Sequence, residues 1–65
     1  MYDFKSGDLV QVDPALIAGK ARVSKGVGVV ERTANGGTIT FVKWPDKFIA
    51  LHERTCDLVP VGGGS

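Results

Sequence analysis

Two turn signals that lie close together constrain the fold of this chain more than any other feature. Asn35-Gly36 separates an apolar run at 26–33 from a second at 38–44, and Pro45-Asp46-Lys47 separates the second from a third at 48–52. Asn and Gly tolerate the positive φ angles of tight hairpin turns, and Pro and Asp also favour turns. The spacing therefore predicts three consecutive antiparallel strands that form a meander.

The apolar runs have the composition of strands. The segment 38–44, TITFVKW, is rich in β-branched and aromatic residues. It is apolar on both faces, with Ile39 and Phe41 on one face and Val42 and Trp44 on the other. The segment 26–33, GVGVVERT, contains glycines, which often mark a bend or bulge in a strand. Small barrels need such bends to close.

Two further strands flank the meander. The segment 8–13, DLVQVD, shows strand alternation, and 58–61, LVPV, is a short last strand after the connection 54–57. Pro60 cannot donate a ladder hydrogen bond, so we expect this strand to pair on one side only.

Between the first two strands, residues 15–25 predict a long loop with one helical turn. Asp13 would cap this turn, Pro14 would lie in its first positions, and Gly19 would end it. Lys20, Arg22 and Lys25 make this loop the most basic part of the chain.

These elements predict an all-β protein of five strands. Closing such a sheet into a small barrel removes most of its exposed edges. We expect residues 1–61 to form a single domain and residues 62–65, Gly-Gly-Gly-Ser, to be a flexible tail, either native or an artificial linker. The residues expected in the core are Val10, Val12, Val29, Ile39, Phe41, Ile49, Leu51, Leu58 and Val61.

The composition restricts the function classes. Eight Lys or Arg residues against seven Asp or Glu give a net charge of +1, unlike the strongly basic balance typical of nucleic-acid binders. The single cysteine excludes an internal disulfide, and one cysteine with one histidine does not make a zinc site without carboxylates or a second chain. There is no apolar run of transmembrane length and no signal-peptide core, so we expect a cytoplasmic protein without membrane contact, metal or cofactor.

Short motifs spread along the chain resemble the SH3-like small barrels, most closely their Tudor-like and KOW-like branch. The matching motifs are GDLVQV at 7–12, GVGVV at 26–30, ITFV at 39–42, KFIAL at 47–51 and DLVPV at 57–61. The resemblance covers residues 7–61. It implies a five-stranded SH3-like barrel with a short 3₁₀ turn before the last strand.

Two bacterial groups in this branch are the most similar. They are the Tudor-like domain at the C-terminus of the UvrD and PcrA helicases, which docks on RNA polymerase, and the RNA-polymerase-interacting domain of the CarD family. The resemblance thus implies a non-enzymatic protein-interaction module that docks on transcription or DNA-repair machinery such as RNA polymerase. The small photosystem I barrel that docks ferredoxin shares only the fold pattern with this chain. The tetrameric type II dihydrofolate reductase has a V-Q-I-Y active-site motif that is missing here.

We expect the partner-binding surface to combine an exposed strand edge with aromatic and basic side chains. These side chains are Trp44, Phe48, Lys20, Arg22 and Lys25. If Ile39 and Phe41 fill the core, Trp44 is at least partly exposed, and exposed aromatic residues are frequent hot spots. In the alternative arrangement, Trp44 covers an open end of the barrel or packs under Tyr2 and Phe4.

A second hypothesis is nucleic-acid binding through the same face. Phosphates would contact Lys20, Arg22, Lys25, Lys43 and Lys47, and a base would stack on Trp44. The basic loop can equally be a solvated surface that keeps the domain soluble. Both a monomer and a weak homodimer through the Pro60 strand are consistent with the sequence.

His52 and Cys56 are the remaining residues with catalytic chemistry. A thiol with a histidine base suggests a nucleophile, but the sequence provides neither an orienting third group nor the length for an enclosed pocket. We therefore expect no enzyme, and we expect Cys56 to fill the core as a small apolar residue.

Overall fold

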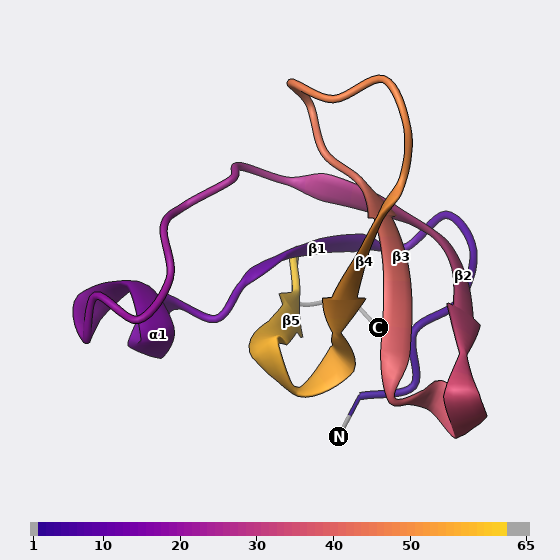
Figure 1. Cartoon of the computed structure of the whole chain (residues 1–65), viewed down its shortest axis with the longest axis horizontal. Helices are drawn as coiled ribbons and strands as arrows, with labels where there is room; N and C mark the ends of the chain where they lie inside the picture. Colours follow the sequence, from indigo (N-terminus) through magenta and orange to yellow (C-terminus); the bar gives the residue numbers. More distant parts are fainter. Residues whose placement is uncertain (1, 63–65) are drawn as a thin grey trace.

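The structure is a computed structural model in which residues 2–62 are described, so residues 63–65 of the expected tail lie outside the described residues. It is all-β, with five antiparallel strands in one sheet of order β4-β3-β2-β1-β5 (Figure 1). The strands are β1 (Leu9–Val12), β2 (Gly28–Ala34), β3 (Ile39–Lys43), β4 (Leu51–Arg54) and β5 (Leu58–Pro60). One α-helical turn, α1 (Pro14–Ala18), and two 3₁₀ turns, η1 (Asn35–Gly37) and η2 (Thr55–Asp57), complete the described chain.

The five-stranded architecture and the 3₁₀ turn before the last strand confirm the predicted fold class. The barrel is not closed, because β4 and β5 are the two edges of the sheet and no ladder joins them in the described part of the chain. The turn η2 connects these edges, and Pro60 pairs only with Val10 of β1, as its missing N–H predicts.

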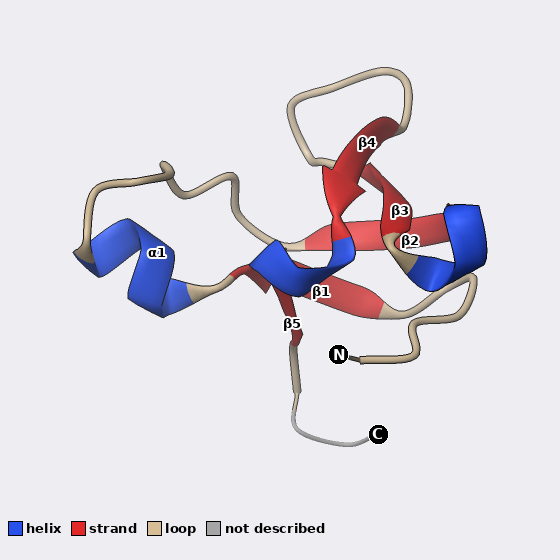
Figure 2. Ribbon diagram, turned by 60° about the horizontal axis from the view of Figure 1, so that its bottom comes forward, coloured by secondary structure: helices blue, strands red, loops and turns tan. Residues whose placement is uncertain are grey.

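The local turn signals also act as predicted. Asn35, Gly36 and Gly37 have φ angles of 53°, 68° and 91°, the left-handed conformations that Asn and Gly adopt at low cost. Asp13 caps α1 by accepting a hydrogen bond from the Ala15 amide at 3.0 Å, and Pro14 is the first residue of the helix. Figure 2 shows α1 lying beyond the end of β1, away from the β3–β4 end of the sheet.

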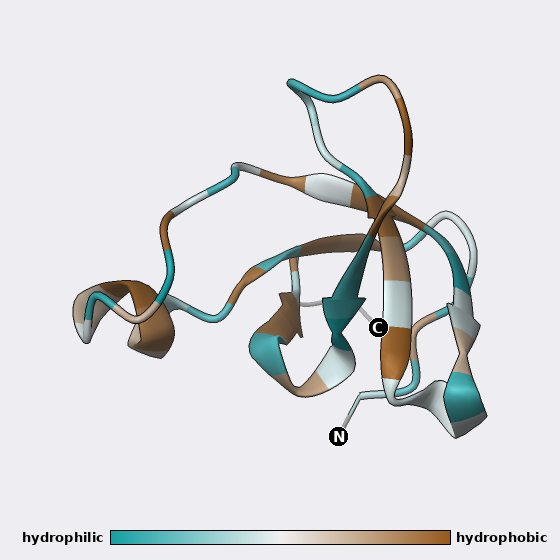
Figure 3. Cartoon of the chain, viewed as in Figure 1, coloured by the Kyte–Doolittle hydropathy of each residue, from teal (hydrophilic) through white to brown (hydrophobic). Residues whose placement is uncertain are grey.

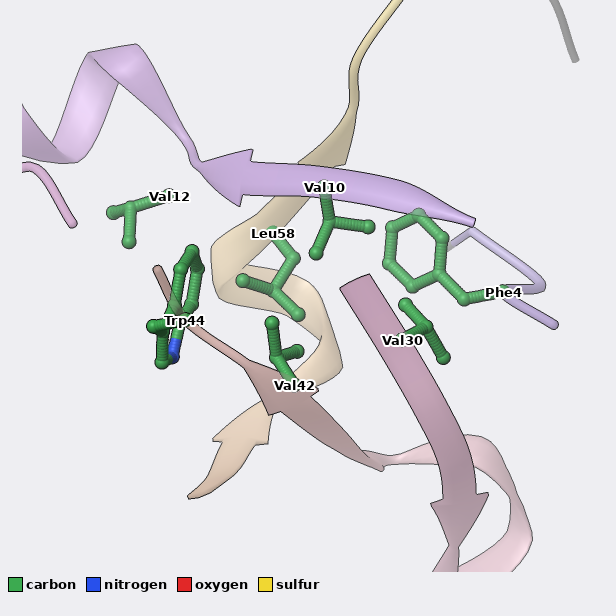
Figure 4. Packing of buried hydrophobic residues seen from close by; sticks show 7 residues of the cluster. All are labelled: Phe4, Val10, Val12, Val30, Val42, Trp44 and Leu58. Carbon is green, nitrogen blue, oxygen red and sulfur yellow. The ribbon is translucent and has the colours of Figure 1, made fainter. Parts of the chain in front are cut away.

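The core differs in part from the expected set. Figure 4 shows its buried apolar residues, which are Phe4, Val10, Val12, Val30, Val42, Trp44 and Leu58. Val10, Val12 and Leu58 confirm the prediction, and Leu51 packs against the cluster. The prediction was wrong for Val29 and Ile49, which are exposed, and for Ile39, Phe41 and Val61, which are only partly buried.

A one-residue difference in register explains the error in β3. A turn limited to residues 45–47 would pair Trp44 with Phe48. The observed ladder pairs Val42 with Leu51 and Thr40 with Glu53, so each residue of β3 lies opposite a residue one position later in the chain than that turn would give. A shift of one residue moves every side chain of a strand to the other face. The even-numbered residues of β3 therefore point inward, and Ile39 and Phe41 lie on the outer face of the sheet.

The inward position of Thr40 is stabilised by a buried polar pair. The Thr40 and Thr55 hydroxyl oxygens lie 2.7 Å apart, so the two side chains form a hydrogen bond with each other away from water.

A β-bulge between Val30 and Arg32 shifts the β2–β3 register, which leaves Gly28 and Val30 buried and Val29 exposed.

Gly28 is needed because β2 passes close to the inward side chains of β3. A Cβ atom at this position would overlap Val42 Cγ1 and lie 2.8 Å from Trp44 Cε3. We expect Gly28→Ala to lower the free energy of unfolding by about 2 kcal/mol through overpacking. Urea denaturation followed by circular dichroism measures this. Gly19→Ala is the matched control, since its Cβ would meet no atom closer than 3.5 Å, and its stability should change by less than about 0.5 kcal/mol. Equal losses in the two variants would contradict this packing.

Candidate interaction site

A buried carboxylate on β4 organises one side of the molecule. Glu53 is 6% exposed and faces inward opposite Thr40. Its Oε1 lies 2.7 Å from Nη2 of Arg22, and its Oε2 lies 2.8 Å from Nζ of Lys25. Its Oε2 also accepts a hydrogen bond from the Trp44 indole Nε1 at 3.1 Å. Glu53 therefore joins the loop between β1 and β2 to the end of β3.

The same cluster includes a second carboxylate. The other guanidinium nitrogen of Arg22 lies 2.8 Å from Asp57 Oδ2 in η2. Burial works to raise the pKa of Glu53, but the hydrogen bonds from Lys25, Arg22 and Trp44 outweigh it and hold the pKa below its ordinary value. The hydrogen bond to Glu53 raises the pKa of Arg22. Both groups are charged at neutral pH, and the cluster is a satisfied internal network.

The structure thus engages two of the three cations of the basic loop in internal ion pairs. Arg22 and Lys25 are used inside the protein, where they hold the loop against β4 and η2. Lys20 is exposed and forms no ion pair with any residue from 2 to 62. Of the three, only Lys20 offers its charge to a partner in this conformation.

An exposed Trp44 is expected only if Ile39 and Phe41 fill the core; they do not, and that arrangement is wrong. The Trp44 side chain is fully buried, with 0% exposure, between β2 and the Glu53 cluster. The Lys25 ammonium lies 5.6 Å from the centre of a Trp44 ring, within the range of a cation–π contact. Trp44 thus belongs to the core and offers no surface to a partner protein or a base.

Phe48 is the sequence-selected aromatic residue that lies on the surface. It is 99% exposed and its neighbour Ile49 is 70% exposed. Both lie in the connection of residues 44–50, hereafter the β3–β4 loop, which projects from the sheet in Figures 1 and 2. Figure 3 shows hydrophobic colour on the half of this loop that leads into β4.

The base of the β3–β4 loop is held firmly. Trp44 is buried, the Lys47 amide donates to the Trp44 carbonyl oxygen at 3.1 Å, and Gly26 lies against the Pro45 ring. The expected strand at 48–52 was wrong in its start, because β4 begins at Leu51. The register that turns Trp44 inward thus leaves Phe48 and Ile49 outside the sheet, and the sequence reasoning missed Ile49 by assigning it to the core.

A small cleft lies between the N-terminal segment and the edge of the sheet. Its volume is about 270 Å³, and it is lined by Tyr2, Asp3, Phe4, Lys5, Asp8, Leu9, Pro60 and Val61. This volume lies just below the range of about 300–1,000 Å³ that is typical of small-molecule sites. The Lys5 ammonium in its wall is paired with Asp3 at 3.4 Å, and Tyr2 stacks on Phe4 with ring centres 5.6 Å apart.

Among residues 2–62, the hydrogen-bond partner of the Cys56 side chain is Asp57, and no hydrogen bond joins it to His52. Cys56 is exposed, which corrects the expectation that it fills the core, and its Sγ lies 3.7 Å from Asp57 Oδ1. His52 is exposed on the outer face of β4 and pairs in the ladder with Phe41. The described residues contain no cluster of three or more His, Cys, Asp or Glu side chains that could hold a metal ion.

The two remaining cations of the nucleic-acid hypothesis lie in different places. Lys43 is on the outer face of β3, where its Nζ lies 3.3 Å from the Trp44 carbonyl oxygen, and Lys47 is exposed in the β3–β4 loop.

None of the helices between residues 2 and 62 has the length and hydropathy needed to cross a membrane. In comparisons with known proteins, no family model, no curated protein and no solved structure matches this chain.

Proposed function

We propose that this chain is a non-enzymatic protein-interaction module that docks on its partner through the tip of the β3–β4 loop. The observation that carries the proposal is the pair of adjacent apolar side chains, Phe48 at 99% and Ile49 at 70% exposure, on a loop whose base is fixed. Two large apolar side chains that stand together in water are costly for a free protein, and they become favourable when a partner covers them.

The magnitude of this effect makes the pair a substantial part of a docking contact. Full burial of one Phe or Ile side chain is favourable by about 1.5–3 kcal/mol, so the pair can supply several kcal/mol of binding free energy. Because the core and the Glu53 cluster hold both ends of the loop, docking costs less backbone entropy than ordering an unanchored loop would.

The partner class follows from the resemblance to the Tudor-like and KOW-like barrels. It points to transcription or DNA-repair machinery, and RNA polymerase is the specific partner that we propose. The five-stranded sheet and the η2 turn agree with such a barrel. The binding surface of this chain is then the loop tip, while Trp44, Arg22 and Lys25 support it from inside.

Nucleic-acid binding through Trp44 and the basic loop has little geometric support. Stacking requires an accessible ring face, and Trp44 has none. Phosphate binding by Arg22 and Lys25 would require them to leave Glu53, which would then be buried and unpaired.

The test is binding to purified bacterial RNA polymerase, measured by biolayer interferometry. We expect the double variant Phe48→Ser with Ile49→Ser to bind at least about tenfold more weakly than the wild type, because it removes more than about 1.4 kcal/mol of apolar burial. The control is Val23→Ser, which removes an apolar side chain that is 71% exposed in another loop and should change binding by less than about twofold.

Each outcome has a defined meaning. A wild-type chain that does not bind the polymerase overturns the choice of partner. Wild-type binding that the double variant retains overturns the loop tip as the docking surface. Since all the substituted residues are exposed, circular dichroism should show unchanged folding in both variants.

A further inference from the structure

The outer face of β2, β3 and β4 carries three of the basic residues that the internal network does not use, Arg32, Lys43 and Arg54. Ladder partners share a face, and the observed pairs are Phe41 with Arg32, Phe41 with His52, and Ile39 with Arg54. Lys43 follows Phe41 by two residues on β3 and so lies on the same face. We define the outer face as Arg32, Ile39, Phe41, Lys43, His52 and Arg54.

The charges on this face are not neutralised by ion pairs. The ion pairs of residues 2–62 involve only Lys5, Arg22 and Lys25 as cations. Arg32 and Arg54 are exposed, and Lys43 contacts only a backbone carbonyl. Three permanent positive charges and one histidine thus lie across three adjacent strands.

The carboxylates are mostly elsewhere. Glu53 points inward from β4 and is already paired, and β3 contains no acidic residue. Glu31, at the bulge beside Arg32, is the single exposed carboxylate of the three strands. A protein with a net charge of only +1 therefore carries a locally basic face, because four of its seven acidic residues, Asp3, Asp8, Glu53 and Asp57, lie in the N-terminal segment or the Glu53 cluster.

An aromatic ring lies at the centre of this face with a planar cation stacked on it. The guanidinium carbon of Arg32 lies 3.8 Å from the centre of the Phe41 ring. Such stacking orders the guanidinium and leaves its other face and its N–H donors available. Bases of single-stranded nucleic acids stack on aromatic rings and on guanidinium planes, while neighbouring cations contact phosphates.

We propose that the outer face binds single-stranded nucleic acid without strong sequence preference. Arg32 and Phe41 would provide the stacking platform, and Arg54 and Lys43 would contact phosphates on either side of it. This site is distinct from the β3–β4 loop tip and does not depend on the proposed docking function. An acidic protein segment is the competing ligand: its carboxylates can pair with the guanidinium N–H donors, but only a base makes use of the stacking face of the platform.

The test uses fluorescein-labelled oligo(dT) and fluorescence anisotropy at low salt. We expect the wild type to bind with a dissociation constant between about 10⁻⁴ and 10⁻⁶ M, and to weaken as salt rises with a logarithmic slope of about −1.4, for the two phosphate contacts of Arg54 and Lys43. The variant Arg32→Ala with Arg54→Ala should bind at least about tenfold more weakly, since it removes the stacked cation and a phosphate contact.

The control removes the same charge elsewhere. Lys20→Ala with Lys47→Ala also deletes two unpaired cations and should weaken binding by less than about twofold. Arg32→Lys keeps the charge but removes the plane, and about threefold weaker binding is expected. The Phe48→Ser and Ile49→Ser double variant should bind oligo(dT) like the wild type, which keeps this test separate from the docking test.

Three results would overturn the proposal. They are no binding of oligo(dT) by the wild type, equal losses in the two double-alanine variants, and binding of poly-L-glutamate as tight as that of oligo(dT) with no effect of Arg32→Lys. The last result would identify the face as a site for acidic proteins. Unchanged thermal unfolding of each variant shows that the exposed substitutions leave the fold intact.

Discussion

Replacing Trp44 with alanine is expected to lower the free energy of unfolding by about 4 kcal/mol, as large-to-small substitutions of fully buried aromatic residues do. Trp44 is the largest fully buried side chain of the described chain, and it contacts the position of Gly28 in β2 and the Glu53 carboxylate. A domain of this size is stable by only about 3–10 kcal/mol. The variant should therefore be largely unfolded, or close to it, at room temperature.

Urea denaturation followed by far-UV circular dichroism measures this loss, and Phe48→Ala is the matched control. Both substitutions remove an aromatic side chain, but Phe48 is 99% exposed, so its variant should differ from the wild type by less than about 0.5 kcal/mol. Trp44→Phe should fall between the two, because it keeps most of the packing but loses the hydrogen bond to Glu53. Comparable stability of Trp44→Ala and Phe48→Ala would contradict the assignment of Trp44 to the core.

The second large effect is expected at Glu53. Glu53→Gln should lower the free energy of unfolding by about 3 kcal/mol, since removing one member of a buried ion pair leaves its partners uncompensated. Arg22 and Lys25 are both partly accessible to water, which limits the loss to the lower end of the range for such substitutions. The control Glu31→Gln makes the same change at an exposed carboxylate and should cost less than about 0.5 kcal/mol.

Glu53 also predicts how stability depends on pH. Its pKa is lower in the folded protein than in the unfolded chain, so its contribution is fully present above the unfolded value of about 4.3 and is lost as the pH falls toward the folded value. The wild type should therefore lose stability below about pH 4.3, and the gap between it and Glu53→Gln should narrow there. Urea denaturation at a series of pH values tests this, and a gap that stays constant down to low pH would contradict a charged Glu53 in the network.

The strands and turns of this chain follow from local chemistry, and this part could be predicted. Asn35-Gly36 specifies a hairpin because both residues accept positive φ, and Asp13 with Pro14 specifies the start of a helical turn. Pro60 restricts its strand to an edge. Each of these signals depends on one or two neighbouring residues, so no knowledge of the remaining chain is needed.

The register between β3 and β4 could not be obtained in the same way. β3 is apolar on both faces, so alternation alone does not decide which face is buried. The observed choice is stabilised by contacts between residues far apart in the sequence, namely Thr40 with Thr55 and Glu53 with Arg22. The extra residue at the β2 bulge adds a second shift that no periodic pattern contains.

The errors in the candidate site follow from this register. With Ile39 and Phe41 assigned to the core, Trp44 had to be assigned to the surface, and Ile49 to the interior. The sequence nevertheless contained a signal for the Glu53 cluster. Side chains alternate between the two faces of a strand, so a core position for Leu51 places Glu53 on the inward face as well. A buried carboxylate requires a cationic partner, and Arg22 and Lys25 are close in sequence to the start of β2, which pairs with β3. Applying that requirement would have predicted the internal use of the basic loop.

The register of β3 and β4 is central to both the fold and the docking surface, because it turns Trp44 inward onto Glu53 and leaves Phe48 and Ile49 outside. Acrylamide quenching of tryptophan fluorescence tests this most directly, because Trp44 is the single tryptophan of the chain. We predict blue-shifted emission in the native protein, with quenching far weaker than in the urea-unfolded chain. Native emission and quenching equal to those of the unfolded chain would contradict the buried position of Trp44.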